Sequence, residues 1–281
     1  MMTQSFVDIH CHLLPEIDDG AKDFGESLAM ARLAVEDGTT TIIATPHQLG
    51  NFGHNKGDDI RRRVTELQQQ LAAAEVPLKV LPGGDVRIEP GMVEAIVRGE
   101  VLSLGDHRRH VLVELPHELY LPLEPVLEEL SRRKMVGVLS HPERNQGILR
   151  QPNVLPPLVD AGCLLQITAG SLCGTFGPQC QQFSEWLLAE GLVHFVATDA
   201  HGPRSRRPLM RRAFERVVEL TDESTALALC GRNPAHVATG AAVRAGRREK
   251  PRRRRSWLFS ALKGPHIKAQ GAALGERVEI N

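Results

Sequence analysis

The sequence lacks the long apolar runs and the leader features of membrane and secreted proteins. No stretch of about 18 consecutive apolar residues occurs, so we predict no transmembrane helix. The opening stretch, MMTQSFVDIH, has no basic region ahead of an apolar run, and we expect no signal peptide. The five cysteines are odd in number and have no CxxC spacing, which is typical of reduced thiols in the cytoplasm.

Glycine-rich phosphate-binding loops and fixed-period repeats are missing as well. The first strand-like run is followed by CHLLPEIDDG, which contains neither GxGxxG nor GxxxxGK(S/T). A doubly wound nucleotide-binding sheet normally carries such a loop at this position. The absence favours a closed barrel over an open sheet.

Seven short apolar runs alternate with amphipathic segments along the chain. We predict strands at residues 5–10, 40–45, 78–82, 111–115, 136–141, 163–168 and 193–198. We predict helices at residues 24–36, 58–75, 90–98, 122–134, 153–160, 179–190 and 204–219. Asp23 and Glu26 stand at capping-box spacing before the first helix, and Gly38 follows it as a C-cap would. Nearly all-apolar strands between helices indicate a parallel sheet buried on both faces, and hence an α/β fold.

Charge is balanced overall but unevenly distributed. The 34 basic and 34 acidic residues cancel. Residues 244–255 nevertheless hold eight basic residues and one acid, a charge of +7, which leaves −7 on the remainder. An acidic body with a basic tail is unlike a general nucleic-acid binder, so we expect no nucleic-acid partner.

Side chains that can bind metals follow six of the seven predicted strands. The carboxyl ends of all strands lie on one rim of a parallel barrel, so these side chains would converge there. They are His10, His12, Asp18, Asp19, His47, Asp85, Glu114, His141, Asp199 and His201. A carboxylate at a strand end can instead cap the next helix, which explains Asp18 and leaves Asp85 open, but it does not explain the repeated histidines. We therefore predict a multi-metal site.

The predicted ligands are imidazoles and carboxylates, with no cysteine in a metal-ligand spacing. This mixture suits Mn²⁺, Fe²⁺ or Zn²⁺ and argues against a structural cysteine–zinc site. About eight ligands exceed the needs of one ion, so we expect two or three ions. Clustered ions of this kind clamp phosphoryl oxygens and activate a water molecule as a nucleophile.

The motifs DIHCH, DDGAKD, TPH, HPER and TDAH occur in this order and together resemble the PHP (polymerase and histidinol phosphatase) superfamily. The stretch over residues 8–47 is most similar to the bacterial PHP-type protein-tyrosine phosphatases of capsule and exopolysaccharide systems. The resemblance covers residues 6–240 and implies a distorted (β/α)7, TIM-like barrel, the PHP fold.

The resemblance also implies site residues and cofactors. It implies a trinuclear, often manganese, centre. Together with the ligand count we expect two or three divalent ions, Mn²⁺ first, with Fe²⁺, Zn²⁺ or Mg²⁺ as alternatives. Their ligands would be His10, His12, Asp19, His47, Asp85, Glu114, His141, Asp199 and His201. The relatives carry Glu where this chain has Asp85, so a carboxylate bridge between two ions must shift here or use one oxygen.

Two arginines and one histidine of the ligand set are implied to act on the substrate. Arg144 in HPER would bind the phosphate, and a second arginine falls on Arg207, with the adjacent Arg206 as the alternative. His201 is either a metal ligand or the proton donor to the leaving group.

The activity that the resemblance implies is hydrolysis of phosphotyrosine on proteins, in the cytoplasm, with a bacterial tyrosine kinase tail as the expected partner. A cysteine-based mechanism is excluded, because no cysteine is followed by an arginine six residues later. Two alternatives stay open. One is a small-molecule PHP phosphatase acting on histidinol phosphate or a nucleotide, and the other is a non-catalytic metal-binding regulatory domain.

The resemblance ends near the basic tail. We assign residues 1–243 to the phosphatase domain and residues 244–281 to the tail. The tail joins its basic run to an apolar patch of Trp257, Leu258, Phe259 and Leu262. It is either flexible, or it docks residues 247–262 on an anionic membrane surface or an acidic partner.

One loop and one further histidine are candidates for substrate contact. The polar, glycine-rich loop 51–58 is expected to be mobile over the site, and it carries His54. We expect the remaining histidines to be surface or core residues; they are His107, His110, His117, His194, His236 and His266.

Overall fold

The computed structural model describes residues 5–248, and residues 1–4 and 249–281 lie outside the described part. The strands are β1 (Phe6–Cys11), β2 (Thr39–Ala44), β3 (His47–Gln48), β4 (Lys79–Pro82), β5 (Asp85–Arg87), β6 (His110–Glu114), β7 (Val136–Ser140), β8 (Leu164–Thr168) and β9 (Phe195–Ala197). The helices are α1 (Phe24–Asp37), α2 (Gly57–Ala73), α3 (Met92–Arg98), α4 (Glu124–Arg132), α5 (Gln146–Arg150), α6 (Leu155–Asp160), α7 (Ala169–Leu172), α8 (Pro178–Ala189), α9 (Arg211–Leu220), α10 (Glu223–Leu227) and α11 (Asn233–Ala238). Short 3-10 turns lie at Leu104–Asp106, Pro142–Arg144 and Pro152–Val154, and a π-helical turn lies at Ala228–Arg232.

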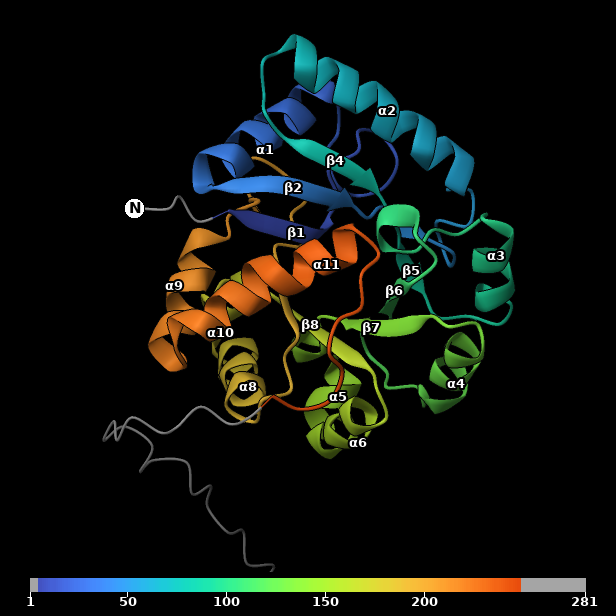
Figure 1. Ribbon diagram of the computed structural model, residues 1–281, viewed down its shortest axis with the longest axis vertical. Coiled ribbons are helices and arrows are strands. Elements are labelled where there is room, and N and C mark those ends of the chain that lie inside the picture. Colours follow the sequence, from blue (N-terminus) through green and yellow to red (C-terminus); the bar gives the residue numbers. More distant parts are fainter. Residues whose placement is uncertain (1–4, 249–281) are drawn as a thin grey trace, which may run out of the picture. The chain divides into compact units, whose positions relative to one another are not determined.

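All the strand pairs are parallel, in the orders β1-β2-β4 and β3-β5-β6-β7-β8-β9. β3 follows directly from β2, and β5 from β4, so each pair is one strand with a break in it. The two ends of this series also meet. The Asp199 N–H donates to the His10 carbonyl at 2.7 Å, and the His12 N–H donates to the Ala200 carbonyl at 2.8 Å. The strands therefore form a ring (Figure 1), which confirms the predicted distorted (β/α)7 barrel.

Apolar side chains fill the inside of the ring and close one end of it. Val7, Leu112 and Phe195 belong to one buried cluster, together with Leu104 and Val237. Val237 belongs to α11, which crosses the strands in Figure 1, and α11 lies against the residue that precedes β9. The amino end of the barrel is thus plugged, which leaves the carboxyl ends of the strands for a site.

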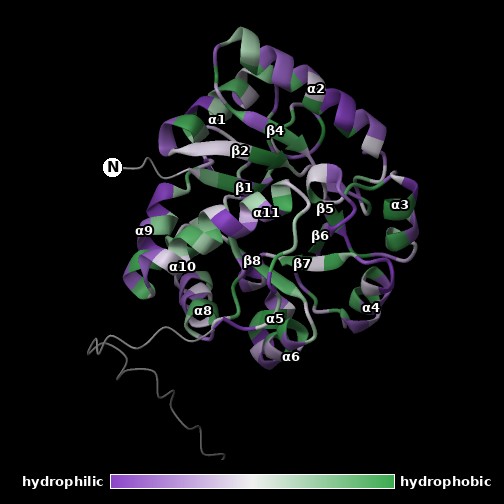
Figure 2. Cartoon of the chain, viewed as in Figure 1, coloured by the Kyte–Doolittle hydropathy of each residue, from purple (hydrophilic) through white to green (hydrophobic). Residues whose placement is uncertain are grey.

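The helices surround the barrel with their hydrophilic faces outward. In Figure 2 hydrophilic residues are concentrated on outer helices such as α2, whereas β7 and β8 are mainly hydrophobic. The predicted ends of α1 are confirmed. The Asp23 side chain accepts from the Glu26 N–H at 2.8 Å, and Gly38 ends the helix in the left-handed region at φ 104°.

The prediction of a helix at 204–219 is wrong in its first turns, because α9 begins only at Arg211. Residues 201–210 form a loop in which the His201 N–H donates to the Arg206 carbonyl at 2.9 Å. Pro208 lies in this loop, and proline disfavours helical geometry in the residue before it. The loop, and not a helix, follows the last metal-binding motif.

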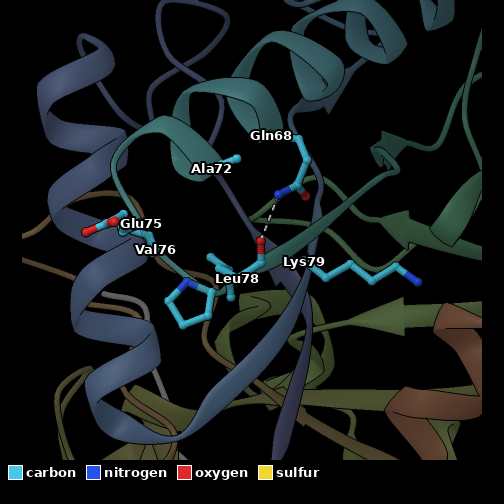
Figure 3. A pocket seen from close by; sticks show the side chains of 7 residues that line it. Gln68, Ala72, Glu75, Val76, Leu78 and Lys79 are labelled. Atoms are coloured by element: carbon cyan, nitrogen blue, oxygen red, sulfur yellow. Dashed lines mark hydrogen bonds between the residues drawn. The ribbon is translucent and has the colours of Figure 1, made fainter.

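A shallow depression lies between α2 and the start of β4, away from the carboxyl ends of the strands (Figure 3). The Gln68 side chain spans it. Its amide nitrogen donates to the Leu78 carbonyl at 3.0 Å, and its oxygen accepts from the Val80 N–H at 2.8 Å. Gln68 therefore fastens α2 to the sheet edge, a structural role that explains this polar residue.

The described chain continues past residue 243 in contact with the barrel. The Arg247 guanidinium pairs with Asp160 at 2.6 Å, and the Arg248 N–H donates to the Gly191 carbonyl at 2.9 Å. The basic run beyond Arg248 and the apolar patch at residues 257–262 lie outside the described residues.

Candidate metal centre

All nine predicted metal ligands come together at the carboxyl ends of the strands. They form four overlapping groups in which the ligand atoms lie within 4.8 Å of one another. The groups are His12, Asp19, His47 and His201; His10, His12 and Asp85; His10, His141 and Asp199; and His47, Asp85 and Glu114. Residues shared between groups place several potential ion positions next to one another.

Two buried partners orient the histidines of the DIHCH motif. The Nδ1 of His10 lies 2.9 Å from Gln166 Oε1, and the Nδ1 of His12 lies 2.7 Å from Asp18 Oδ2. An acceptor at Nδ1 fixes the tautomer in which Nε2 carries the lone pair. The two Nε2 atoms face each other at 3.3 Å, as expected for nitrogens that converge on a cation.

Asp18 does not cap a helix, contrary to the interpretation from the sequence, since Asp23 caps α1. Besides His12, the Asp18 carboxylate accepts from the His47 N–H at 3.0 Å. Despite its burial, the pKa of Asp18 is lowered to about 2 by His12. Asp18 is therefore an ionised carboxylate behind the ligands. The sequence analysis included Asp18 among the side chains that follow the strands. Its neighbour Asp19 is the aspartate of this motif that belongs to a candidate ligand group.

Asp85 gives the clearest sign that the cluster fits metal ions. Its side chain is fully buried, and neither oxygen accepts a hydrogen bond from any residue within 5–248. Oδ2 lies 3.5 Å from His10 Nε2 and 3.3 Å from His47 Nδ1. A buried carboxylate that accepts no hydrogen bond costs several kcal/mol unless nearby positive charge compensates it, and a divalent ion would supply that charge. Although shorter than Glu, Asp85 still lies in two of the four groups.

The electrostatics of the cluster show closely packed carboxylates balanced by imidazoles. Burial and the nearby Asp85 carboxylate raise the pKa of Glu114 to about 7. Burial alone would lower the pKa of His10, but the Asp199 and Asp85 carboxylates raise it to about 9. Asp85 likewise raises the pKa of the largely buried His47 to about 10. Without ions, protonated histidines thus supply the positive charge that these carboxylates need.

His201 has the geometry of a ligand. Its Nδ1 lies 3.0 Å from the Asp199 carbonyl oxygen, and its Nε2 lies 3.6 Å from Asp19 Oδ1. Burial and the adjacent His12 lower the pKa of His201 to about 2, so the ring is neutral. With the Nδ1 proton donated to a carbonyl, Nε2 is left with a lone pair and no proton to give.

Asp199 joins the ligand cluster to the arginines. Its Oδ1 lies 3.3 Å from His10 Nε2, whereas its Oδ2 accepts from the guanidinium groups of both Arg144 and Arg206, the latter at 2.6 Å. Despite burial, His10 and Arg144 hold the pKa of Asp199 well below its usual range.

Of the two adjacent candidates for the second arginine, Arg206 and not Arg207 pairs with Asp199. Arg207 is exposed, and within residues 5–248 no hydrogen bond or ion pair links it to the cluster. Arg206 has a left-handed backbone at φ 47°, which turns its side chain back toward Asp199. His141 and Asp199 also have positive φ, 31° and 49°. Non-glycine residues seldom adopt this region, and such strain is concentrated at functional sites.

The loop that carries His54 is fastened beside the cluster. Phe52 stacks on His47 with ring centroids 5.2 Å apart, and His54 lies 6.2 Å from Phe52. The buried Asn55 side chain donates to the His47 and Ile17 carbonyls at 2.9 and 3.0 Å. Contact of His54 with substrate stays a prediction.

The cysteines and the helices of the described chain bear on disulfides and membrane spans. All five cysteines are free, and Cys11 is fully buried. Within residues 5–248, no helix is both long enough and apolar enough to cross a membrane.

The fold and the site together define a class of protein: a metal-dependent hydrolase built on a parallel α/β barrel. Within that class, the chain belongs to the CpsB/CapC family of capsular polysaccharide synthesis, whose sequence profile matches residues 6–239. This confirms the resemblance inferred from the motifs.

Two relatives and two solved structures extend the comparison. The tyrosine-protein phosphatase YwqE of Bacillus subtilis is 41% identical over 202 residues, 71% of this chain and 79% of the relative. The tyrosine-protein phosphatase CpsB of Streptococcus pneumoniae is 24% identical over 81% of this chain and 96% of the relative. A crystal structure from work on YwqE and CpsB, described as metal-dependent tyrosine phosphatases, matches with a TM-score of 0.81 at 35% identity, covering 88% of this chain and all of that one. A lactonase of Listeria monocytogenes, 13% identical with a TM-score of 0.56 over 85% of this chain and 96% of its own, shares the fold alone.

Proposed function

We propose that this protein is a metal-dependent phosphatase that hydrolyses phosphotyrosine on proteins. The observation that carries the proposal is the convergence of nine histidine and carboxylate side chains on one rim, with two arginines held at their edge by Asp199. Membership of a family whose relatives are named tyrosine-protein phosphatases supports the same activity.

The ligand set supports two or three divalent ions, and the resemblance to the PHP superfamily favours Mn²⁺ among them. Mixed imidazole and carboxylate ligands suit Mn²⁺, Fe²⁺ and Zn²⁺, whereas Mg²⁺ favours oxygen ligands. We assign His10, His12, Asp19, His47, Asp85, Glu114, His141, Asp199 and His201 as the ligands. Bound ions would neutralise phosphoryl oxygens and lower the pKa of a coordinated water.

Other side chains of this protein would bind the phosphate and orient it. Arg144 and Arg206 present guanidinium groups that can pair with phosphoryl oxygens, and Asp199 fixes their position relative to the ligands. A tyrosine leaving group has a pKa of about 10, so it departs without strong proton donation. This agrees with the role of His201 as a ligand whose Nε2 carries no proton.

We propose a tyrosine kinase of capsular or exopolysaccharide synthesis as the substrate protein. The family description supports this system, and the free thiols support a cytoplasmic location. The negative charge of the chain outside residues 244–255 argues against a nucleic-acid substrate.

Assays of three substrate classes with added Mn²⁺ test the proposal. We expect a phosphotyrosyl peptide to be hydrolysed faster than histidinol phosphate or a nucleotide, and His141→Ala to abolish the activity. Preference for a small substrate would instead indicate a small-molecule phosphatase, and absence of all three activities would indicate a regulatory domain. Activity that survives His141→Ala would contradict the metal mechanism.

A further inference from the structure

Phe176 lies beneath both arginines of the site. It belongs to the short loop between α7 and α8. The guanidinium carbon of Arg144 lies 4.7 Å from the ring centroid, and that of Arg206 lies 5.9 Å from the same centroid. Asp199 Oδ2 accepts from the same two guanidinium groups. The pair is thus held by one carboxylate oxygen and one aromatic ring.

The two arginines need such a partner because their like charges repel each other. One carboxylate balances only one of the two charges, and Asp199 also faces the metal ligands through Oδ1. The side chains of Arg144 and Arg206 are only 13% and 29% exposed, so water screens them poorly. The negative face of an aromatic ring attracts cations most strongly under these conditions.

Few other contacts fix the arginines. The Nε atoms of Arg144 and Arg206 are buried and have no hydrogen-bond partner in the described chain. Loss of the ring would therefore free the guanidinium groups to move apart while Asp199 keeps only one contact to each.

The backbone around Phe176 is shaped to hold the ring in place. Gly174 and Gly177 have positive φ of 83° and 88°, and the Thr175 N–H donates to the Gly170 carbonyl at 2.8 Å. A Cβ atom on Gly170 would lie 3.0 Å from Cε2 of Phe176, so a larger residue there would push the ring away by a few tenths of an ångström.

We propose that Phe176 is a positioning residue that holds Arg144 and Arg206 together as one phosphate-binding unit through its aromatic face. It acts through the arginines and does not touch the substrate. The proposal rests on the proposed phosphatase function in one respect: it takes phosphate to be the anion that the two arginines bind.

Calorimetry of inorganic phosphate binding to the full-length, Mn²⁺-loaded protein tests this role without requiring catalysis. Phe176→Leu should weaken phosphate binding about tenfold, since two partly desolvated cation–π contacts are lost. Phe176→Trp retains an aromatic face and should bind within about twofold of the unmodified protein. The matched control is Phe183→Leu, because Phe183 is also half-buried but stacks on Trp186, and it should leave binding unchanged.

A double-mutant cycle separates positioning from general packing. In a chain that already carries Arg144→Gln and Arg206→Gln, Phe176→Leu should cause no further loss of phosphate affinity. Metal content should be the same in all variants. Unchanged binding in Phe176→Leu, or equal losses in the Leu and Trp variants, would overturn the proposal. A protein that binds phosphate as described but does not hydrolyse phosphotyrosine would instead refute the proposed function alone.

Discussion

At Asp199 one carboxylate serves two sets of partners. Oδ1 faces His10, while Oδ2 holds Arg144 and Arg206. Because both sets share one buried side chain, the candidate ligands and the arginines keep a fixed separation. Behind them, buried acceptors such as Asp18 and Gln166 hold the imidazole rings. Residues outside the ligand set thus also shape the site.

Asp18→Ala should weaken metal binding about 10- to 100-fold, because His12 loses the acceptor that orients its ring. Competition with a chelator measures this affinity. The control is Asp23→Ala, which removes the cap of α1 and should cost about 1 kcal/mol of stability without changing metal affinity. Equal effects of the two variants on metal affinity would refute the role given to Asp18.

Metal uptake should release protons. The carboxylates around His10 and His47 raise their pKa values to about 9 and 10 in the metal-free protein, so both rings are protonated near neutral pH. An imidazole must lose a proton to bind an ion, so metal affinity should rise with pH up to these values. Calorimetry in buffers of different ionisation enthalpy counts the protons, and a count of zero contradicts this electrostatic account.

At the scale of elements, two interrupted strands place ligands that a regular barrel would place elsewhere. After its break, the second strand resumes at His47 and the third at Asp85, and these two residues are register partners in β3 and β5. The Asp85 N–H donates to the Pro46 carbonyl at 3.1 Å across the break. Gly83 and Gly84 form the second break. Both positions need glycine because their neighbours leave no room for a side chain.

Gly84→Ala tests this arrangement. The new Cβ would lie 2.4 Å from Oε1 of Gln48, a fully buried side chain that accepts from the Leu102 N–H at 2.8 Å. We expect a loss of about 1–3 kcal/mol in the free energy of unfolding, together with weaker metal binding. Urea unfolding measures the first effect. In the control Gly53→Ala the Cβ makes only an ordinary 3.6 Å contact, and a similar loss there would contradict the explanation.

His194 should make the barrel sensitive to acid. It precedes β9, where its Nδ1 accepts from the Leu165 N–H at 3.0 Å and its Nε2 lies 3.0 Å from the Gly246 carbonyl. Burial lowers its pKa from 6.5 to about 4, so between these pH values the unfolded chain binds more protons and is favoured.

The free energy of unfolding should therefore fall as pH drops from 6.5 to 4, by up to about 3 kcal/mol from this residue. Urea titrations across this range measure the fall. His194→Gln should flatten the curve, whereas replacement of the exposed His117 by Gln should not. Identical pH dependence in both variants would show that His194 is not responsible.

For the whole molecule, sequence reasoning reached the barrel and the set of side chains that converge on its rim, but not their fine placement. The strand-end motifs were sufficient for His10, His12 and Asp199, because parallel strands bring their carboxyl ends together. Which of Arg206 and Arg207 faces Asp199 depends on the left-handed backbone of Arg206 in a loop, and no sequence periodicity reveals that conformation. Gln166 lies inside an apolar strand, and β3 and β5 are too short to give a pattern.

The basic tail begins within the described chain and continues beyond it. Residues 244–248 contact the barrel through Arg247 and Arg248, and the rest of residues 249–281 lies outside the described chain. Flexibility of the tail, or docking of residues 247–262, stays a prediction.

The central claim is that one rim of the barrel holds a cluster of divalent ions that is required for phosphotyrosine hydrolysis. Elemental analysis of the purified, active protein, expressed as ions per chain, tests it most directly. The account predicts two or three ions per chain, predominantly manganese, with activity lost when a chelator removes them and regained when Mn²⁺ returns. Full activity toward phosphotyrosine in protein that contains less than one ion per chain would contradict it.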